Sequence, residues 1–297
     1  MLSIVVLTRN RKIELLKALR SCIECTAPEK MEFIIIDNAS HDDTREAVKQ
    51  FFIENDKYVC NYHYISENIG VAGGRNEGFK MAHGRYVYFL DDDAYLEKTN
   101  PLFFNELIKI FEENNDVICV TTLIFDTAIN DFRDAKKSKK DNFDGNYKKI
   151  LMFCGGSFIL DKQRLIDKNK IFLEHQIWGM EELYPSLKWY FSGFCVVQTE
   201  NLCVVHNPSL NTRFGKKREI ILYYTGSVHY KFIFYPPITY PLLYSMFILR
   251  IIKHIGFTGL FEAVSQLKHI NHNMEKETIS FSMLWRLFTE FGFTATF

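Results

Sequence analysis

Short apolar runs alternate with segments of helical periodicity over the first half of the chain, and no other feature constrains the fold as strongly. The runs are rich in β-branched and aromatic residues, which is typical of buried strands. They comprise residues 2–7, 32–36, 62–65, 85–90 and 117–125. Between the first two runs, Ile13, Leu16, Leu19 and Ile23 recur near the helical spacing. Strands and helices in repeated alternation predict a mostly parallel α/β sheet.

Several segments carry signals for helix starts and turns. Ser40 and Asp43 form a variant of the capping box and predict a helix start. Asn100 followed by Pro101 predicts another. Residues 70–78 are rich in glycine and lead through a short helix into the next strand. Their glycine doublet is expected either to let the backbone approach a ligand or to mark a turn.

The overall charge and the cysteines exclude some classes of protein. Lysine plus arginine and aspartate plus glutamate number 36 each, so no overall field would attract nucleic acid, and we expect no nucleic-acid partner. The seven cysteines lie mostly inside apolar runs, where a thiol behaves as a small hydrophobe, and this favours a reducing cytoplasm. The N-terminal run resembles a buried strand and lacks a positively charged leader, so we expect no secretory signal.

The character of the sequence changes beyond residue 207. Residues 232–257 are aromatic and aliphatic, and their unbroken apolar part, residues 242–249, is far shorter than the roughly 20 residues of a spanning helix. Arg250, Lys253 and His254 follow. This pattern predicts a helical surface that rests on a membrane, with core packing or a dimer contact as the alternatives.

Three consecutive carboxylates, Asp91, Asp92 and Asp93, follow a run of apolar and aromatic residues. We expect them at the carboxyl end of the sheet, where open α/β folds bind ligands. Three adjacent acids are unfavourable unless a cation compensates them, and Mg²⁺ or Mn²⁺ bridging a substrate diphosphate would do so. An acidic turn or a helix cap is the alternative.

This triplet is one of several motifs whose order along the chain resembles the family 2 glycosyltransferases of the GT-A fold, including rhamnosyltransferase-like enzymes of polysaccharide biosynthesis. The resemblance extends from Ile4 to about His206, and it implies a Rossmann-like, mixed and mostly parallel sheet and a metal-dependent, inverting transfer of a sugar. The motifs are Val5-Val-Leu-Thr-Arg-Asn, Ile36-Asp-Asn-Ala-Ser-His-Asp-Asp-Thr, Asn68-Ile-Gly-Val-Ala-Gly-Gly-Arg-Asn-Glu-Gly, Leu90-Asp-Asp-Asp and Trp178-Gly-Met-Glu-Glu.

By this resemblance, polar residues of the motifs would bind the donor. Thr8 and Asp37 would contact the donor base, Asp91 the donor ribose or sugar, and Asp93 the metal. A carboxylate at a strand end, as at Asp37, can accept from a pyrimidine N–H, with an Asx turn as the alternative. Arg75 would pair with the diphosphate or with an aspartate of the triplet. The residues expected to bind the donor are Thr8, Asn10, Asp37, Asn68, Gly74, Arg75, Asp91 and Asp92.

His206 follows the apolar run Leu202-Cys-Val-Val and is expected to be a second metal ligand beside Asp93. A structural histidine at a strand end is the alternative. The expected cofactor is Mn²⁺ or Mg²⁺.

The catalytic base is expected in the pair Glu181 and Glu182, because the resemblance places a carboxylate that faces the acceptor hydroxyl after the Trp178-Gly motif. The family more often has Glu-Asp here, so the choice between the two glutamates stays open, and an acidic pair at a helix N-terminus is the alternative. Gly155, Gly156 and Trp178 are expected on the acceptor side, unless the glycines only bend a strand.

We therefore expect a glycosyltransferase that moves a sugar from a UDP- or dTDP-linked donor onto a carbohydrate or lipid-linked acceptor. A sugar nucleotidyltransferase and a non-catalytic scaffold of the same fold are the alternatives. The expected catalytic domain is residues 1–210, with a donor half at 1–125 and an acceptor half at 150–210. Residues 126–149 would form a solvated loop. Residues 211–297 would form a helical extension. We expect the protein to be cytoplasmic, with this extension in contact with the inner face of the membrane or with a second copy of the chain.

Overall fold

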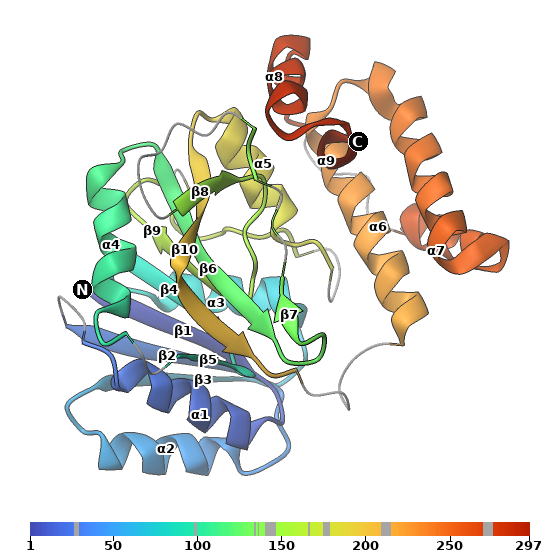
Figure 1. Ribbon diagram of the computed structural model, residues 1–297. Coiled ribbons are helices and arrows are strands. Elements are labelled where there is room, and N and C mark those ends of the chain that lie inside the picture. The colour runs from blue at the N-terminus through green and yellow to red at the C-terminus, as the bar shows by residue number, and fades with distance from the viewer. Residues whose placement is uncertain are drawn as a thin grey trace.

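A computed structural model describes residues 1–26, 30–97, 100–133, 135, 137–139, 147–165, 167–174, 179–208, 215–269 and 276–297. The strands are β1 (Leu2–Thr8), β2 (Met31–Asn38), β3 (Val59–Ile65), β4 (Tyr86–Asp91), β5 (Ala94–Leu96), β6 (Val117–Asp126), β7 (Asp131–Phe132), β8 (Tyr147–Ile150), β9 (Ser157–Asp161) and β10 (Cys195–His206). They form one sheet in the order β3-β2-β1-β4-β9-β6-β10-β5, with β7 paired to β6 and β8 to β10 (Figure 1).

Helices cover both faces of this sheet and continue beyond it at the C-terminal end (Figure 1). They are α1 (Lys12–Ile23), α2 (Thr44–Glu54), α3 (Gly70–Met81), α4 (Phe103–Glu113), α5 (Leu183–Phe191), α6 (Lys216–Phe234), the 3-10 helix η2 (Pro237–Thr239), α7 (Tyr240–His269), α8 (Phe281–Phe291) and α9 (Phe293–Thr296).

The strands β3, β2, β1, β4, β6 and β10 run in one direction, whereas β9 and β5 run against their neighbours. The predicted mixed, mostly parallel α/β sheet is therefore confirmed. Parallel strands bring their carboxyl ends to one edge of the sheet. The strands that meet at this edge end in Thr8, Asn38, Asp91, Asp126 and His206.

Alternate residues of β1 enter different cores, because successive side chains of a strand point to opposite faces of the sheet. Ile4 and Val6 pack with α1, α2 and α4 on one face, whereas Val5 packs with Phe79 of α3 on the other. The helix predicted after β1 is present, but Ile13 is 76% exposed, so the expectation that it belongs to the apolar face is wrong. Leu15 is buried instead, and Leu19 is buried as expected.

The glycine-rich segment is itself the helix α3, and its glycines allow this helix to lie close to β1. A Cβ atom on Gly74 would lie 2.3 Å from Cδ1 of Leu7, and one on Gly78 would lie 2.3 Å from Cγ1 of Val5. Gly74 is not among the residues that line the cavity described below. In this structure the hydrogen side chain of Gly74 serves helix packing, and its expected contact with the donor stays a prediction.

Both predicted helix starts differ in detail from the structure. The hydroxyl of Ser40 accepts a hydrogen bond from the backbone N–H of Asn10, so Ser40 and Asp43 do not form a capping box. The side-chain oxygen of Asn100 accepts from the N–H of Leu102, and helix α4 begins one residue later. Asn100 therefore forms an Asx turn that precedes the helix.

The segment expected to be a solvated loop is partly paired with the sheet. β7 pairs with β6, and Lys137 forms a bridge to Ile150. Lys137 is also ion-paired to Glu200 at 3.1 Å. Residues 134, 136 and 140–146 lie outside the described part of the chain.

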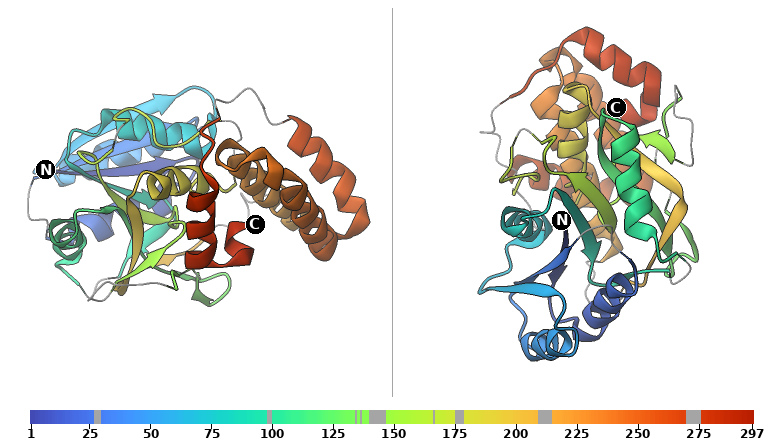
Figure 2. Two further views of the ribbon diagram at one scale, coloured as in Figure 1. Left: turned by 90° about the horizontal axis from the view of Figure 1, so that it is seen from above. Right: turned by 90° about the vertical axis from the view of Figure 1, so that its left-hand side faces the viewer.

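The C-terminal helices share a hydrophobic core with α5, in which Leu187 packs with Tyr230 of α6, Phe247 of α7 and Leu287 of α8. Figure 2 shows these helices lying together beside the sheet. Helix α7 is kinked at Gly256, where φ is 72°. Among the described residues, no helix combines the length with the apolar character required to span a bilayer.

Candidate active site

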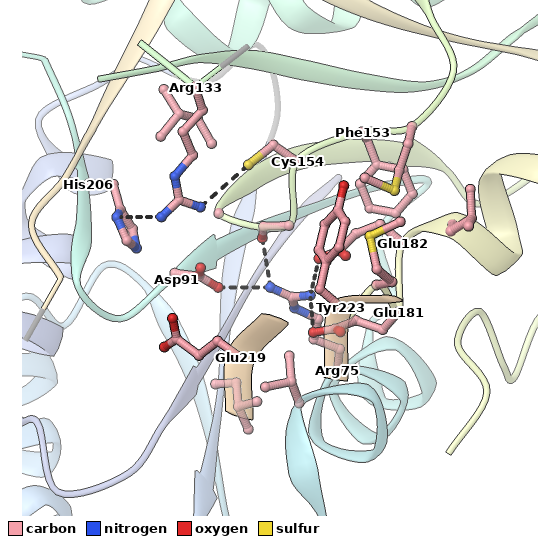
Figure 3. Close-up of a pocket in the computed structure, with 18 of the residues that line it drawn as sticks. Arg75, Asp91, Arg133, Phe153, Cys154, Glu181, Glu182, His206, Glu219 and Tyr223 are labelled. Carbon is pink, nitrogen blue, oxygen red and sulfur yellow. Dashed lines mark hydrogen bonds and ion pairs between the residues drawn. The ribbon is translucent and has the colours of Figure 1, made fainter. Parts of the chain in front are cut away.

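A cavity of about 1120 Å³ lies at the carboxyl edge of the sheet. Its walls come from the ends of β1, β4 and β10, the turn before β9, helix α3, the N-terminal end of α5 and one side of α6. The side chains that converge there are shown in Figure 3. The cavity thus joins the strand ends, where the sequence places its polar motifs, to the C-terminal helices.

The acidic triplet is compensated within the protein by an arginine that the sequence motifs do not single out. Arg11 donates to Asp92 at 2.8 Å and to Asp93 at 2.9 Å. The hydroxyl of Thr8 also donates to Asp92, at 2.8 Å. Burial nevertheless raises the pKa of Asp92 to about 7 against the attraction of Arg11, and the neighbouring charge of Asp93 adds to this rise. Asp92 therefore faces Thr8 and Arg11.

Asp91, Asp93 and His206 form a cluster whose ligand atoms all lie within 4.8 Å of one another. His206 reaches the triplet because β5, which follows Asp93 directly, pairs antiparallel with the end of β10 and places Ala94 opposite His206. The Nε2 atom of His206 lies 3.1 Å from Asp93. These are the oxygen and imidazole ligands that divalent cations such as Mn²⁺ accept.

The other side of His206 faces a second carboxylate. Its Nδ1 atom lies 3.4 Å from Asp126 and 3.0 Å from Arg133, which is itself ion-paired to Asp126 at 2.8 Å. A histidine that binds a metal through one nitrogen usually donates its other ring N–H to a carboxylate. In this structure Arg133 donates to that nitrogen instead, and Asp126 holds Arg133 in place, so the ring is oriented with Nε2 toward Asp93.

Arg75 connects the acidic triplet to the acidic pair before α5. Its guanidinium donates to Asp91 at 2.9 Å, to the carbonyl oxygen of Gly155 at 2.8 Å and to Glu182 at 3.1 Å, as Figure 3 shows. Burial alone would lower its pKa, but the surrounding carboxylates outweigh burial and hold the pKa above the ordinary range. Of the two roles expected for Arg75, the structure shows pairing with an aspartate, and the contact with the donor diphosphate stays a prediction.

Glu181 and Glu182 both line the cavity at the start of α5 but have different partners. Glu181 accepts from the backbone N–H of Gly179 at 2.8 Å. Glu182 accepts from Arg75, and burial together with the charge of Glu181 raises its pKa to about 7 against the attraction of Arg75. A carboxyl group whose pKa lies near neutral pH is suited to general-base catalysis.

Gly155 and Gly156 lie on the same side of the cavity as the acidic pair. A Cβ atom on Gly155 would lie 2.1 Å from Oε1 of Glu182 and 2.7 Å from the guanidinium nitrogens of Arg75. The absence of a side chain therefore permits the contact between Arg75 and Glu182. Trp178 lies outside the described residues.

The remaining donor candidates bind neighbouring loops. Asn10 accepts from the N–H of His41 at 2.7 Å, and Asn68 accepts from Asn38 at 2.9 Å; both line the cavity. Asp37 accepts from the N–H of Ser40 at 2.8 Å and from the hydroxyl of Tyr62. Asp37 is buried and is not among the cavity-lining residues, and its bond to Ser40 spans one residue more than an Asx turn, so its contact with the donor base stays a prediction.

Sequence reasoning missed Arg11, Arg133 and one side of α6. Arg11 lies three residues after Thr8, and its charge near an acidic triplet was a usable signal. Arg133 lies in a segment interpreted as a solvated loop. Tyr223 and Ser227 of α6 line the cavity, but they follow the last motif and only the tertiary structure brings them to it.

Comparison with known proteins identifies relatives of this chain. The family model described as Glycosyl transferase family 2 matches residues 3–168, more than half of the chain. The GalNAc(5)-diNAcBac-PP-undecaprenol beta-1,3-glucosyltransferase of Campylobacter jejuni is 38% identical over 97 residues, which are 32% of this chain and 30% of that protein. The UDP-Glc:alpha-D-GlcNAc-diphosphoundecaprenol beta-1,3-glucosyltransferase WfaP of Escherichia coli is 34% identical over 116 residues, which are 37% of this chain and 43% of WfaP. The chain thus spans less than half the length of either relative.

Solved structures show the same fold at low sequence identity. Residues 1–349 of TarS from S. aureus, in complex with UDP-GlcNAc, superpose with a TM-score of 0.65 at 13% identity, covering 91% of this chain and 81% of that one. The mannosyltransferase PcManGT from Pyrobaculum calidifontis, in complex with GDP-Man and Mn²⁺, superposes with a TM-score of 0.60 at 17% identity, covering 97% of this chain and 78% of that one. The predicted GT-A fold is confirmed.

Proposed function

The chain belongs to glycosyl transferase family 2, and from this premise we propose that it transfers a sugar, with inversion, from a nucleotide-diphosphate donor to a hydroxyl group of a carbohydrate or lipid-linked acceptor. One observation carries the proposal: a single cavity contains both a cluster that can hold a cation, Asp91, Asp93 and His206, and a buried carboxyl group with a raised pKa, Glu182. A direct displacement needs charge stabilisation at the leaving diphosphate and a group that takes the proton of the acceptor.

Asp93 and His206, with Asp91 beside them, would hold the cation. The donor set of two carboxylates and an imidazole supports Mn²⁺ or Mg²⁺ as the cofactor, and PcManGT was solved with Mn²⁺. When bound, such an ion supplies Lewis-acid stabilisation of the leaving diphosphate. Arg11, which now pairs with Asp92 and Asp93, would be free to turn toward the donor phosphates once a cation neutralises these carboxylates.

Glu182 would take the proton from the acceptor hydroxyl while the hydroxyl oxygen attacks the anomeric carbon of the donor. Arg75 would position carboxylates on both the donor and the acceptor side, because its guanidinium contacts Asp91 on the donor side and Glu182 on the acceptor side. Gly155 and Gly156 leave the space between these groups open. Trp178 would lie on the acceptor side, as its motif implies.

We propose a UDP- or dTDP-linked sugar as the donor. WfaP is named for UDP-Glc, and TarS was solved with UDP-GlcNAc. Thr8, Asn10 and Asn68 line the cavity where such a nucleotide would lie. Asp37 lies behind this wall and would reach a pyrimidine base only if the hydrogen bond from Tyr62 gives way.

We further propose that the acceptor is a lipid-linked glycan of cell-surface synthesis and that the protein contacts the inner face of the membrane. The Campylobacter and E. coli relatives are named for undecaprenol-linked acceptors. Phe257 and Phe261 of α7 are 71% and 84% exposed, and Lys253 lies on the same helix. Exposed aromatic residues beside a basic residue suit the surface of an anionic membrane. A contact between two copies is the alternative use of this surface.

Two rival functions have less support. A sugar nucleotidyltransferase would normally have a glycine-rich phosphate loop after its first strand, and the segment after β1 begins Arg9-Asn10-Arg11 without glycine. A non-catalytic scaffold would not require the buried carboxyl group of Glu182, whose pKa is raised and which the absence of a side chain at Gly155 leaves accessible from the cavity.

Thermal unfolding with nucleotides tests the proposed function. UDP or dTDP with Mn²⁺ or Mg²⁺ should raise the melting temperature well above the value with chelator, because ligands that bind only the native state stabilise it. Asp93→Asn should abolish the metal-dependent part of this shift. Asp56→Asn, at an exposed position on the connection between α2 and β3, is the matched control and should retain the full shift.

Hydrolysis of a panel of nucleotide sugars by the same preparations then identifies the donor. Equal stabilisation by nucleotide with metal and with chelator would contradict the cation site. Nucleotide binding without any transfer or hydrolysis would favour the scaffold.

A further inference from the structure

One side of α6 forms a wall of the cavity. Glu219, Tyr223, Ser227 and Lys231 all line it, and they recur every four residues, which places them on the same side of the helix. Figure 3 shows Glu219 and Tyr223 among the side chains around Arg75. Twelve residues separate Glu219 from Lys231, which corresponds to about 18 Å along a helix. The cavity therefore extends from the acidic cluster along α6 to Lys231.

Lys231 is a buried cation with no partner in the described part of the protein. Its residue is 3% exposed, and none of the described residues forms a hydrogen bond or ion pair with its ammonium group. Burial, together with the positive charge of Arg250, lowers its pKa to about 7. An unpaired buried charge is unfavourable, so a cationic side chain in the wall of a cavity favours an anionic ligand at that position.

Arg250 of α7 lines the same cavity and adds a second positive charge. Its guanidinium donates to main-chain oxygens of Phe297 at 2.7 Å and of Thr294 at 3.0 Å. These two bonds fix the side chain and use only part of its five donors. Arg250, which the sequence assigned to a basic outer surface, is thus half-buried at the cavity, and the membrane contact stays a prediction.

The cavity carboxylates with charged partners are engaged elsewhere. Asp91 and Glu182 are both paired with Arg75, and Asp93 with Arg11 and His206. Glu219, on the same helix, lies too far along its axis to reach Lys231. Among the described residues, none of the carboxylates that line the cavity is ion-paired with Lys231 or Arg250, so both side chains can bind an anionic ligand.

We propose that Lys231 and Arg250 bind a phosphate group of the acceptor, and that this phosphate is attached to an apolar chain. A guanidinium fork beside an ammonium group is suited to phosphate oxygens. The pair lies at the far end of α6 from Glu219, so a phosphate there belongs to the acceptor rather than to the donor. Leu249, next to Arg250, is 61% exposed, and α7 continues with exposed apolar residues, which suits an attached lipid. The proposal rests on the proposed transfer function.

A binding measurement in the presence of chelator tests the site without requiring turnover. Farnesyl diphosphate should raise the melting temperature of the protein, whereas farnesol should not. Inorganic pyrophosphate separates the sources of phosphate: a smaller shift than with farnesyl diphosphate supports a lipid phosphate, and an equal shift overturns that part of the proposal. Lys231→Met should weaken farnesyl diphosphate binding at least tenfold, because hydrogen bonds to charged groups typically contribute that much.

Lys216→Met is the matched control. Lys216 is an exposed lysine on the same helix and lies outside the cavity, so its removal should leave farnesyl diphosphate binding unchanged. Without ligand, Lys231→Met should melt at a higher temperature than the wild type, because the substitution removes an unpaired buried charge. An unchanged Kd for farnesyl diphosphate in Lys231→Met overturns the proposal.

Kinetics separate the failure of this proposal from failure of the proposed function. Two acceptors can carry the same sugar, one on a prenyl diphosphate and the other on a neutral alkyl chain. Lys231→Met should raise KM for the prenyl diphosphate acceptor about tenfold and leave KM for the alkyl acceptor unchanged. Hydrolysis of the donor should not change. Equal effects on both acceptors with intact donor hydrolysis reject the phosphate site alone, whereas absence of turnover with every nucleotide sugar rejects the proposed function.

Discussion

Glu181 and Glu182 are neighbours in the sequence but are held in different ways. The carboxylate of Glu181 accepts from a backbone N–H, and this fixes it against the turn before α5. The carboxyl group of Glu182 faces Arg75 across the space left by Gly155, and its pKa is raised to about 7. A base must be able to exchange a proton near the working pH, so these surroundings favour Glu182 as the catalytic residue.

We predict that Glu182→Gln lowers the rate of transfer by about 10² to 10⁴, the usual contribution of general-base catalysis, and leaves nucleotide affinity nearly unchanged. Glu181→Gln, which keeps an oxygen that can accept from Gly179, should have a smaller effect. In the wild type, kcat should fall as the pH is lowered through about 7, because protonated Glu182 cannot accept a proton. Initial rates with saturating donor across this pH range provide the measurement.

Two other results would change this assignment. If Glu181→Gln is inactive while it still binds nucleotide and Glu182→Gln is active, the two roles are exchanged. If both variants remain active, the base is a different group.

At the scale of elements, the position of Arg75 depends on how closely α3 lies to β1. Gly74, which precedes Arg75, faces the side chain of Leu7, and a larger residue fits there only if the Leu7 side chain or the helix shifts. Because Arg75 contacts both the acidic triplet and Glu182, a shift of α3 would disturb both sides of the site. The glycines of this motif therefore serve catalysis through packing.

We predict that Gly74→Ala destabilises the protein by about 1–3 kcal/mol, the usual cost of overpacking, and also lowers the rate of transfer. Gly73→Ala is the matched control on the same helix: its new methyl group would meet only the half-exposed side chain of Ile69, which can move. Alanine in place of glycine favours a helix, so Gly73→Ala should be neutral or stabilising. Urea unfolding of both variants measures the difference, and equal stabilities would contradict the packing role.

At the scale of the whole molecule, the hydrophobic cores do not follow a boundary at residue 210. Helix α5, which carries the acidic pair at its start, packs with α6, α7 and α8 in one core. The backbone N–H of Lys139 also donates to the carbonyl of Glu290 in α8, and Lys149 pairs with the Glu290 carboxylate at 2.7 Å. The expected division into a catalytic domain and a helical extension remains a prediction, and this packing favours folding of the two parts as one unit.

We predict that the intact protein binds liposomes of anionic phospholipid through α7. Lys253→Glu should weaken binding by at least about 1 kcal/mol, since each basic group near such a surface contributes about that much. Phe257→Ser and Phe261→Ser should weaken it further. Lys49→Glu, at an exposed position of α2, is the control with the same change of charge and should bind like the wild type.

Co-sedimentation at physiological salt measures these differences. A failure of the intact protein to bind liposomes would exclude the membrane contact. A concentration-dependent dimer that Phe257→Ser and Phe261→Ser dissolve would assign the same surface to contact between copies.

The sequence alone determined the parallel sheet, the order of its motifs and the edge at which their polar residues meet. Strand and helix periodicity is a local property, and parallel strands necessarily bring their carboxyl ends together. For this reason Thr8, Asp91, Asp93 and His206, which lie at strand ends, could be assigned to one edge of the sheet before any coordinates, and the resemblance to family 2 glycosyltransferases added the acidic pair. Their common position in the cavity agrees with that prediction.

Only the tertiary structure decided which partner each of these groups has. Arg75 binds carboxylates because the packing of α3 on β1 aims it between two acidic groups, and no pattern in the sequence specifies that direction. Lys231 and Arg250 lie on different helices and approach the same cavity through the packing of α6 on α7. Long-range contacts of this kind depend on how whole elements pack, and local periodicity contains no information about them.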